Sequence, residues 1–136
     1  MGKLALVRRP SPRLAEGLLT HMERVPIDID LAVRQWEAYV AALESCGWQT
    51  IEVPPAPECP DSVFIEDTVV VYRDTAVMAR PGAIERTPEV PGAEAAVAAL
   101  GYRVVHIQAP GTLDGGDILK VGDTIYAGHS ARTNLE

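Results

Sequence analysis

Two clusters of acidic residues are the clearest candidates for chemistry in this 136-residue chain. The first is Asp61, Glu66 and Asp67, which flank the apolar segment 63–65. Carboxylates beside apolar side chains are costly unless they face solvent, pair with a cation or bind one. If 62–65 is a buried strand, alternation puts Glu66 on the opposite side from the other two acids, so a local bend would be needed to bring them together. The pattern alone is equally compatible with a solvated loop at each end of such a strand.

The second cluster is Gly111-Thr112-Leu113-Asp114-Gly115-Gly116-Asp117. Paired glycines between two acids predict a close backbone approach and a turn that aims the side chains, although a plain glycine-rich turn has the same composition. No Lys-Ser/Thr follows, which excludes a phosphate-binding loop, and the acid spacing of a calcium loop is absent. His21, His106 and His129 are scattered, so we expect no metal site.

The overall composition narrows the possible partners and compartment. Nineteen acidic against twelve basic residues give a net charge of −7, which disfavours a nucleic-acid partner. No apolar run reaches the roughly 18 residues of a membrane-spanning helix, and the N-terminus lacks a secretory signal. With two cysteines, we expect a cytoplasmic protein with free thiols and no membrane partner.

The elements that must position these clusters alternate between strands and helices. We predict strands over residues 4–7 and 48–53, separated by an irregular loop over 10–28 and a helix capped by Asp28 or Asp30 that ends at Gly47. A strand over 62–65 follows, and then strands over 68–72 and 75–79, which are joined by a tight turn. A second helix is predicted with Thr87 as its cap and Pro88 at its first position, followed by a strand over 102–107.

The end of the chain repeats an earlier part. Residues 118–121 and 124–127 predict a second hairpin, and Asp117 before it corresponds to Asp67 before the first, 50 residues earlier. A strand–strand–helix–strand unit with this period predicts a repeat architecture. The length predicts one domain. Leu135-Glu136 is either native or a common cloning remnant, so we assign residues 1–134 to the domain and 135–136 to a possible scar.

Four motifs in this order and spacing resemble the dimethylarginine dimethylaminohydrolase family, of the guanidino-group-modifying pentein superfamily. They are Cys59-Pro60-Asp61-Ser62-Val63-Phe64-Ile65-Glu66-Asp67, Ala79-Arg80-Pro81-Gly82-Ala83, Thr112-Leu113-Asp114-Gly115-Gly116-Asp117 and Ser130-Ala131-Arg132-Thr133-Asn134. The resemblance spans the whole chain and implies part of an α/β propeller built from strand–strand–helix–strand units. Family members are nearly twice as long, and their remaining portion holds the catalytic histidine and nucleophilic cysteine.

The resemblance also implies roles for individual residues. Asp61, Glu66 and Asp67 fall in the substrate-binding motif, where Glu66 and Asp67 would grip a guanidinium group by charge-assisted hydrogen bonds. Arg86 and Arg132 would take the substrate's α-carboxylate, and Leu18 would belong to a lid loop. Asp114 falls at the catalytic position whose carboxylate orients the histidine.

The implied reaction is attack by the cysteine on the guanidinium carbon, loss of dimethylamine and hydrolysis to citrulline, without a cofactor. Neither Cys46 nor Cys59 matches the nucleophile, so we expect this chain to be a truncated, inactive piece. Open strand edges predict a homodimer. The alternatives are an arginine deiminase or amidinotransferase relative, or a non-catalytic arginine-binding or assembly module.

Overall fold

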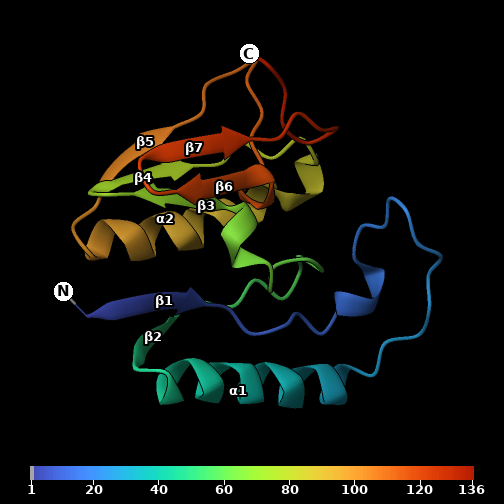
Figure 1. Cartoon of the computed structure of the whole chain (residues 1–136). Helices are drawn as coiled ribbons and strands as arrows, with labels where there is room; N and C mark the ends of the chain where they lie inside the picture. Colours follow the sequence, from blue (N-terminus) through green and yellow to red (C-terminus); the bar gives the residue numbers. More distant parts are fainter. Residues whose placement is uncertain (1) are drawn as a thin grey trace. The chain divides into compact units, whose positions relative to one another are not determined.

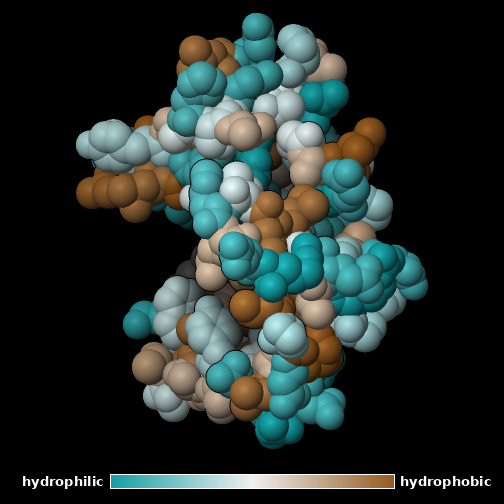
Figure 2. Space-filling model, turned by 90° about the vertical axis from the view of Figure 1, so that its right-hand side faces the viewer, coloured by the Kyte–Doolittle hydropathy of each residue, from teal (hydrophilic) through white to brown (hydrophobic). Residues whose placement is uncertain are grey.

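The computed structural model describes residues 2–136, which divide into two compact units, Met1–Val63 and Phe64–Glu136 (Figure 1). The protein is mixed α/β, with two two-stranded sheets and one three-stranded sheet. Across residues 2–136, no helix combines the length and the apolar character needed to cross a membrane. Apolar side chains form several patches on the surface drawn in Figure 2.

Unit 1 is a parallel strand pair joined through a helix. Strand β1 (Lys3–Val7) pairs in parallel with β2 (Trp48–Glu52), and helix α1 (Ile29–Ser45) connects them. Of the two candidate caps, Asp28 is the one used, since its side chain accepts a hydrogen bond from the Leu31 amide at 2.9 Å. Gly47 follows the helix with φ of +82°, as a left-handed helix end requires. The predicted strands and helix of this unit are confirmed.

The predicted irregular loop of unit 1 contains one short 3₁₀ helix, η1 (Leu14–Glu16). Its flanks are tied to the segment that follows β2. The Ser11 hydroxyl donates to the Pro57 carbonyl at 2.6 Å, and the buried Arg8 side chain donates through Nε to the Pro54 carbonyl at 3.1 Å. Hydrogen bonds thus tie the start of the irregular loop to the segment that follows β2.

Unit 2 is centred on a three-stranded sheet. Strands β3 (Val69–Tyr72) and β4 (Thr75–Met78) form the predicted antiparallel hairpin, and β5 (Arg103–His106) pairs in parallel with β4. Helix α2 (Val90–Ala99) makes the crossover from β4 to β5. Ala76 and Met78 of the sheet and Ala93 and Val97 of the helix are fully buried, which places the core of the unit between them.

Two sequence predictions, one at the start of this unit and one within it, are wrong. Residues 62–65 are not a strand, because the chain turns there and enters the 3₁₀ helix η2 (Ile65–Asp67), closed by a hydrogen bond from the Asp67 amide to the Phe64 carbonyl at 3.1 Å. The second helix starts at Val90, because the expected start, Thr87-Pro88, lies inside another 3₁₀ helix, η3 (Ile84–Glu89). Pro91, in the first turn of α2, takes the place expected for Pro88.

The predicted repeat is present, with a small shift. The 3₁₀ helix η4 (Gly115–Asp117) follows η2 by 50 residues, but β6 (Ile118–Val121) and β7 (Thr124–Ala127) follow β3 and β4 by 49. The extra residue in the first copy is Thr68. In the hairpin register, Thr68 therefore matches Asp117, since their carbonyls accept the equivalent amides of Ala79 and Gly128. Unlike the first hairpin, the second is exposed almost along its whole length.

Candidate functional site

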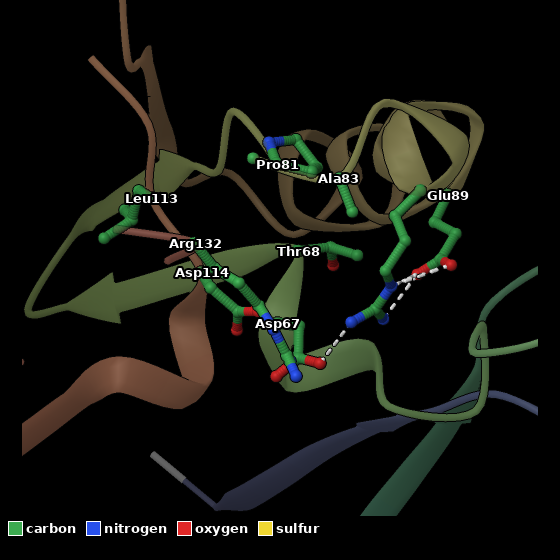
Figure 3. A pocket seen from close by; sticks show the side chains of 10 residues that line it. Asp67, Thr68, Pro81, Ala83, Glu89, Leu113, Asp114 and Arg132 are labelled. Atoms are coloured by element: carbon green, nitrogen blue, oxygen red, sulfur yellow. Dashed lines mark hydrogen bonds and ion pairs between the residues drawn. The ribbon is translucent and has the colours of Figure 1, made fainter. Parts of the chain in front are cut away.

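Four of the predicted site residues come together in unit 2. Asp67, Arg86, Asp114 and Arg132 line one small pocket, with Asp67 and Asp114 side by side (Figure 3). They come from the end of η2, from η3, from the start of η4 and from the loop after β7. Glu66, the neighbour of Asp67, has an exposed side chain and does not line this pocket.

The two 3₁₀ helices that carry the acids are in close backbone contact. A Cβ atom added to Gly115 would lie within van der Waals overlap of the Glu66 carbonyl oxygen, and one on Gly116 would lie 2.7 Å from Asp67 Oδ1. Only glycine allows this approach. The close backbone approach predicted from the paired glycines is confirmed, and it brings Asp67 and Asp114 together.

A buried ion-pair chain holds Asp67 from one side. Arg86 donates from one terminal nitrogen to Asp67 Oδ2 at 2.6 Å, and from Nε and the other terminal nitrogen to the carboxylate of Glu89 at 3.0 and 2.7 Å (Figure 3). Burial acts to lower the pKa of Arg86, but the hydrogen bonds to Glu89 and Asp67 outweigh it and raise the pKa above its ordinary value. Arg86 is therefore a permanent cation within the site.

Asp67 is the acid of the cluster whose pKa is shifted upward. Burial raises the pKa of its carboxyl to about 6; the hydrogen bond from Arg86 opposes this, while the neighbouring Asp114 carboxyl adds to it. A carboxylic acid of this kind gives up its proton near neutral pH or when a cation approaches. Perturbed carboxyls in a pocket are typical of functional sites.

The second pair is looser. The Arg132 side chain, about half exposed, reaches Asp114 Oδ2 at 3.3 Å, while Asp114 Oδ1 accepts the Gly116 amide at 2.9 Å. The Arg132 backbone, in contrast, is fixed, since Gly82 packs against it. Arg132 thus combines a closely packed backbone with a half-exposed guanidinium.

Asp117 anchors the loop that carries Arg132. The hydroxyls of Ser130 and Thr133 both donate to Asp117 Oδ2 at 2.6 Å, and Thr133 also accepts the Asp114 amide at 3.0 Å. The hydrogen bonds from Ser130 and Thr133 lower the pKa of Asp117 below its ordinary value. The loop after β7 is therefore bound to the start of η4.

The remaining predicted site residues lie in unit 1. Leu18, half exposed, donates its amide to Asp61 Oδ2 at 2.9 Å, and a Cβ on Gly17 would fall 2.5 Å from Asp61 Oδ1. Arg24 donates to the Gly17 carbonyl at 2.7 Å. The irregular loop is therefore folded around the buried Asp61 carboxylate.

The structure bears on the other reactive side chains as well. Cys46 is exposed and Cys59 buried, both in unit 1 and without a disulfide. Within residues 2–136, no group of histidine, cysteine and acidic side chains could hold a metal ion. Sequence reasoning missed Glu89, whose three-residue spacing from Arg86 becomes a signal only once η3 is known to be helical.

Sequence comparison places this cluster in a known context. No protein-family model matches the chain. It is 62% identical over 132 residues to an N(G),N(G)-dimethylarginine dimethylaminohydrolase of Streptomyces coelicolor, covering 97% of this chain and 51% of that protein. The homologous enzyme of Pseudomonas aeruginosa is 40% identical over 137 residues, 54% of its length. The chain is homologous to the dimethylarginine dimethylaminohydrolases. It spans about half the length of these relatives.

Solved structures agree with this assignment. The Pseudomonas aeruginosa enzyme, as a cysteine-to-serine mutant in complex with citrulline, superposes with a TM-score of 0.92 at 40% identity, over 99% of this chain and 53% of that one. The N-terminal domain of a cyanobacterial arginine dihydrolase superposes with a TM-score of 0.87 at 24% identity, which shows a shared fold only. The pentein relationship expected from the motifs is thus confirmed.

Proposed function

We propose that the pocket between η2, η3 and η4 binds the guanidinium group of a methylated arginine, as part of an enzyme that hydrolyses dimethylarginine to citrulline. The observation that carries this proposal is the charge balance of the pocket. Its charged lining residues are three acids, Asp67, Glu89 and Asp114, and two arginines, Arg86 and Arg132. The formal charges of these residues therefore sum to −1, and Arg86 is shared between Asp67 and Glu89.

The raised pKa of Asp67 identifies this carboxyl as the group on which the excess negative charge of the pocket falls. Below about pH 6 a proton compensates it; above that pH a cationic ligand would do so. A guanidinium group is a suitable cation because its planar donors match carboxylate oxygens, and the match is strongest where water is excluded. Ligand binding and protonation of Asp67 are then competing events.

The other residues take roles that follow from their exposure. Arg132, whose guanidinium is half exposed, binds the substrate's α-carboxylate; Arg86 would have to release Asp67 to share that role. Asp114 orients the catalytic histidine, which acts on a cysteine nucleophile as general acid and base. On the family resemblance, Asp61 is assigned to substrate binding and Leu18 to a lid loop, and Glu66 assists Asp67.

Four further expectations belong to this proposal: inactivity of the chain alone, a propeller fold, a homodimer and a cytoplasmic location. The chain by itself is inactive, since neither Cys46 nor Cys59 falls at the position of the family's nucleophile. The complete fold is a propeller, and a homodimer buries the apolar side chains of the second hairpin, such as Leu119 and Tyr126. The protein is cytoplasmic. Citrulline formation by the pure chain would contradict the expected inactivity, and a mass that stays monomeric at every concentration would contradict the homodimer.

The binding claim is tested by calorimetric titration of the chain with asymmetric dimethylarginine at pH 7.5 and pH 5. We expect tighter binding at pH 7.5, because Asp67 is then ionised. Asp67→Asn should weaken binding about tenfold or more, the value of one charge-assisted hydrogen bond. Asp123→Asn, at a highly exposed position, is the control and should bind as the parent does.

Citrulline is the matched control ligand, because it keeps the amino-acid end and replaces the guanidinium with a neutral group. Equal affinity for citrulline and dimethylarginine, or binding that Asp67→Asn leaves unchanged, would overturn the proposed guanidinium site. Titration with free arginine separates a methylarginine site from a general arginine site.

A further inference from the structure

The most deeply buried charged group of the pocket has no role in the proposed reaction. Glu89 is the last residue of η3, its side chain is 1% exposed, and both its oxygens accept hydrogen bonds from Arg86. A carboxylate buried this deeply costs free energy unless it is paired with good geometry. The geometry here is good, since two nitrogens on one edge of the guanidinium face two oxygens of the carboxylate.

The arrangement is directional. Glu89 takes Nε and one terminal nitrogen of Arg86, which leaves the other terminal nitrogen aimed at Asp67 Oδ2 at 2.6 Å. Because a guanidinium is rigid and planar, fixing one of its edges fixes the direction of the third nitrogen. Glu89 therefore determines where Arg86 meets Asp67, since Arg86 donates to both carboxylates (Figure 3).

Local structure supports this reading. Arg86 and Glu89 are three residues apart in η3, where 3₁₀ geometry stacks side chains at that spacing. Pro88 lies between them and fixes one backbone angle of the turn. Arg86 and Glu89 are therefore held next to each other by the geometry of η3 itself.

We infer that Glu89 is a positioning residue for Asp67, acting through Arg86: it holds the guanidinium in register and divides its charge between the two carboxylates. One Asp67 oxygen is thereby occupied by Arg86, while the other faces Gly116 and the side of Asp114. The contribution of Glu89 to guanidinium binding rests on the proposed function. Its effect on Asp67, through Arg86, does not depend on that function.

Two substitutions separate charge from position. Glu89→Gln keeps the length and one acceptor oxygen but removes the charge, so more of the positive charge of Arg86 acts on Asp67, and the Asp67 pKa should drop by roughly 1 unit. Glu89→Asp keeps the charge but is one methylene shorter. It draws Arg86 away from Asp67, and the Asp67 pKa should rise above that of the parent chain.

The readout is the pH titration of the Asp67 carboxyl carbon by NMR in the 136-residue chain, with amide spectra to verify that each variant is folded. Glu85→Gln is the matched control, because Glu85 lies in the same 3₁₀ helix with an exposed side chain. It should leave the Asp67 titration unchanged. A merely structural Glu89 would lower stability in both variants without moving the Asp67 pKa in opposite directions.

Unchanged Asp67 titration in both folded variants, or a shift of the same sign in both, would overturn the inference. Dimethylarginine titration of the same samples adds the functional arm, in which Glu89→Asp is expected to bind more weakly than the parent. If the parent chain binds no dimethylarginine, the proposed function fails, while the NMR titration still decides the role of Glu89.

Discussion

The two repeats of unit 2 each contribute an acid–arginine pair to one pocket, but the pairs differ in setting. Asp67 and Arg86, 19 residues apart, are largely buried and joined to a third charged group, Glu89. Asp114 and Arg132, 18 residues apart, combine a buried acid with an arginine whose side chain is 46% exposed. The first pair is fixed by its neighbours, and the second can open towards solvent.

The difference follows from what covers each pair. Helix α2 and η3 follow the first hairpin and enclose Arg86, whereas the described residues after the second hairpin form only the short loop that carries Arg132. Desolvated ion pairs are strong when complete and costly when broken, while exposed pairs are weak in both cases. Similar residue types thus give one rigid and one adaptable contact within the same pocket.

The largest effect is expected from breaking the buried pair. Arg86→Met should cost about 3–5 kcal/mol in the free energy of unfolding, because it leaves the carboxylates of Glu89 and Asp67 buried without their cation. Urea denaturation at pH 7.5 measures this cost. A loss no greater than that of the same substitution at position 132 would remove the distinction between the two pairs.

An intermediate effect is expected from pH. The pKa of Asp67 is about 6 in the folded chain against 3.8 for a free aspartate, so the folded state binds more protons between these values. Its contribution to stability is therefore full below pH 3.8 and is lost as pH rises through 6, by at most about 3 kcal/mol. Urea denaturation from pH 4 to 7.5 should show this loss in the parent chain but not in Asp67→Asn.

The pKa of Asp117 is shifted in the opposite direction to that of Asp67. Because it is lowered in the folded chain, its contribution is present above the unfolded value and lost as pH falls through the folded one. The difference between the parent chain and Asp67→Asn isolates the Asp67 contribution from this background. A difference that does not vary with pH would contradict the raised pKa.

The smallest effect on stability is expected at the open pair. Arg132→Met should cost no more than about 1 kcal/mol, since the guanidinium is half exposed and 3.3 Å from Asp114. Its effect on ligand affinity should be larger, because Arg132 is proposed to bind the α-carboxylate. Calorimetry beside urea denaturation separates the two. Unchanged dimethylarginine affinity would remove Arg132 from the proposed site.

The sequence predicts the strands, α1 and both hairpins, because alternation, helix caps and left-handed glycines are local signals. It does not predict the 3₁₀ helices, since three residues are too few to show a period. Both errors follow from this: the strand expected at 62–65 and the helix start expected at Thr87 each border a 3₁₀ segment.

The pocket residues carry no local signal of their own. The family resemblance implies roles for Asp67, Arg86, Asp114 and Arg132, but their convergence needs tertiary contacts that no local pattern encodes. Glu89 has no such motif, because its importance depends on burial. The interval of 50 between Asp67 and Asp117 holds for the 3₁₀ helices, and Thr68 shifts the hairpins to 49.

The contact between Gly115 and Glu66 limits how the two repeats can diverge. The Glu66 atom that excludes a side chain at position 115 is a main-chain carbonyl, which every residue type has, so no substitution at position 66 can act as a suppressor. At position 116 the obstructing atom belongs to the Asp67 side chain, and a smaller residue at position 67 would relieve it at the cost of the site. Gly115 is therefore required by the backbone of the fold, whereas Gly116 is required by the side chain of Asp67.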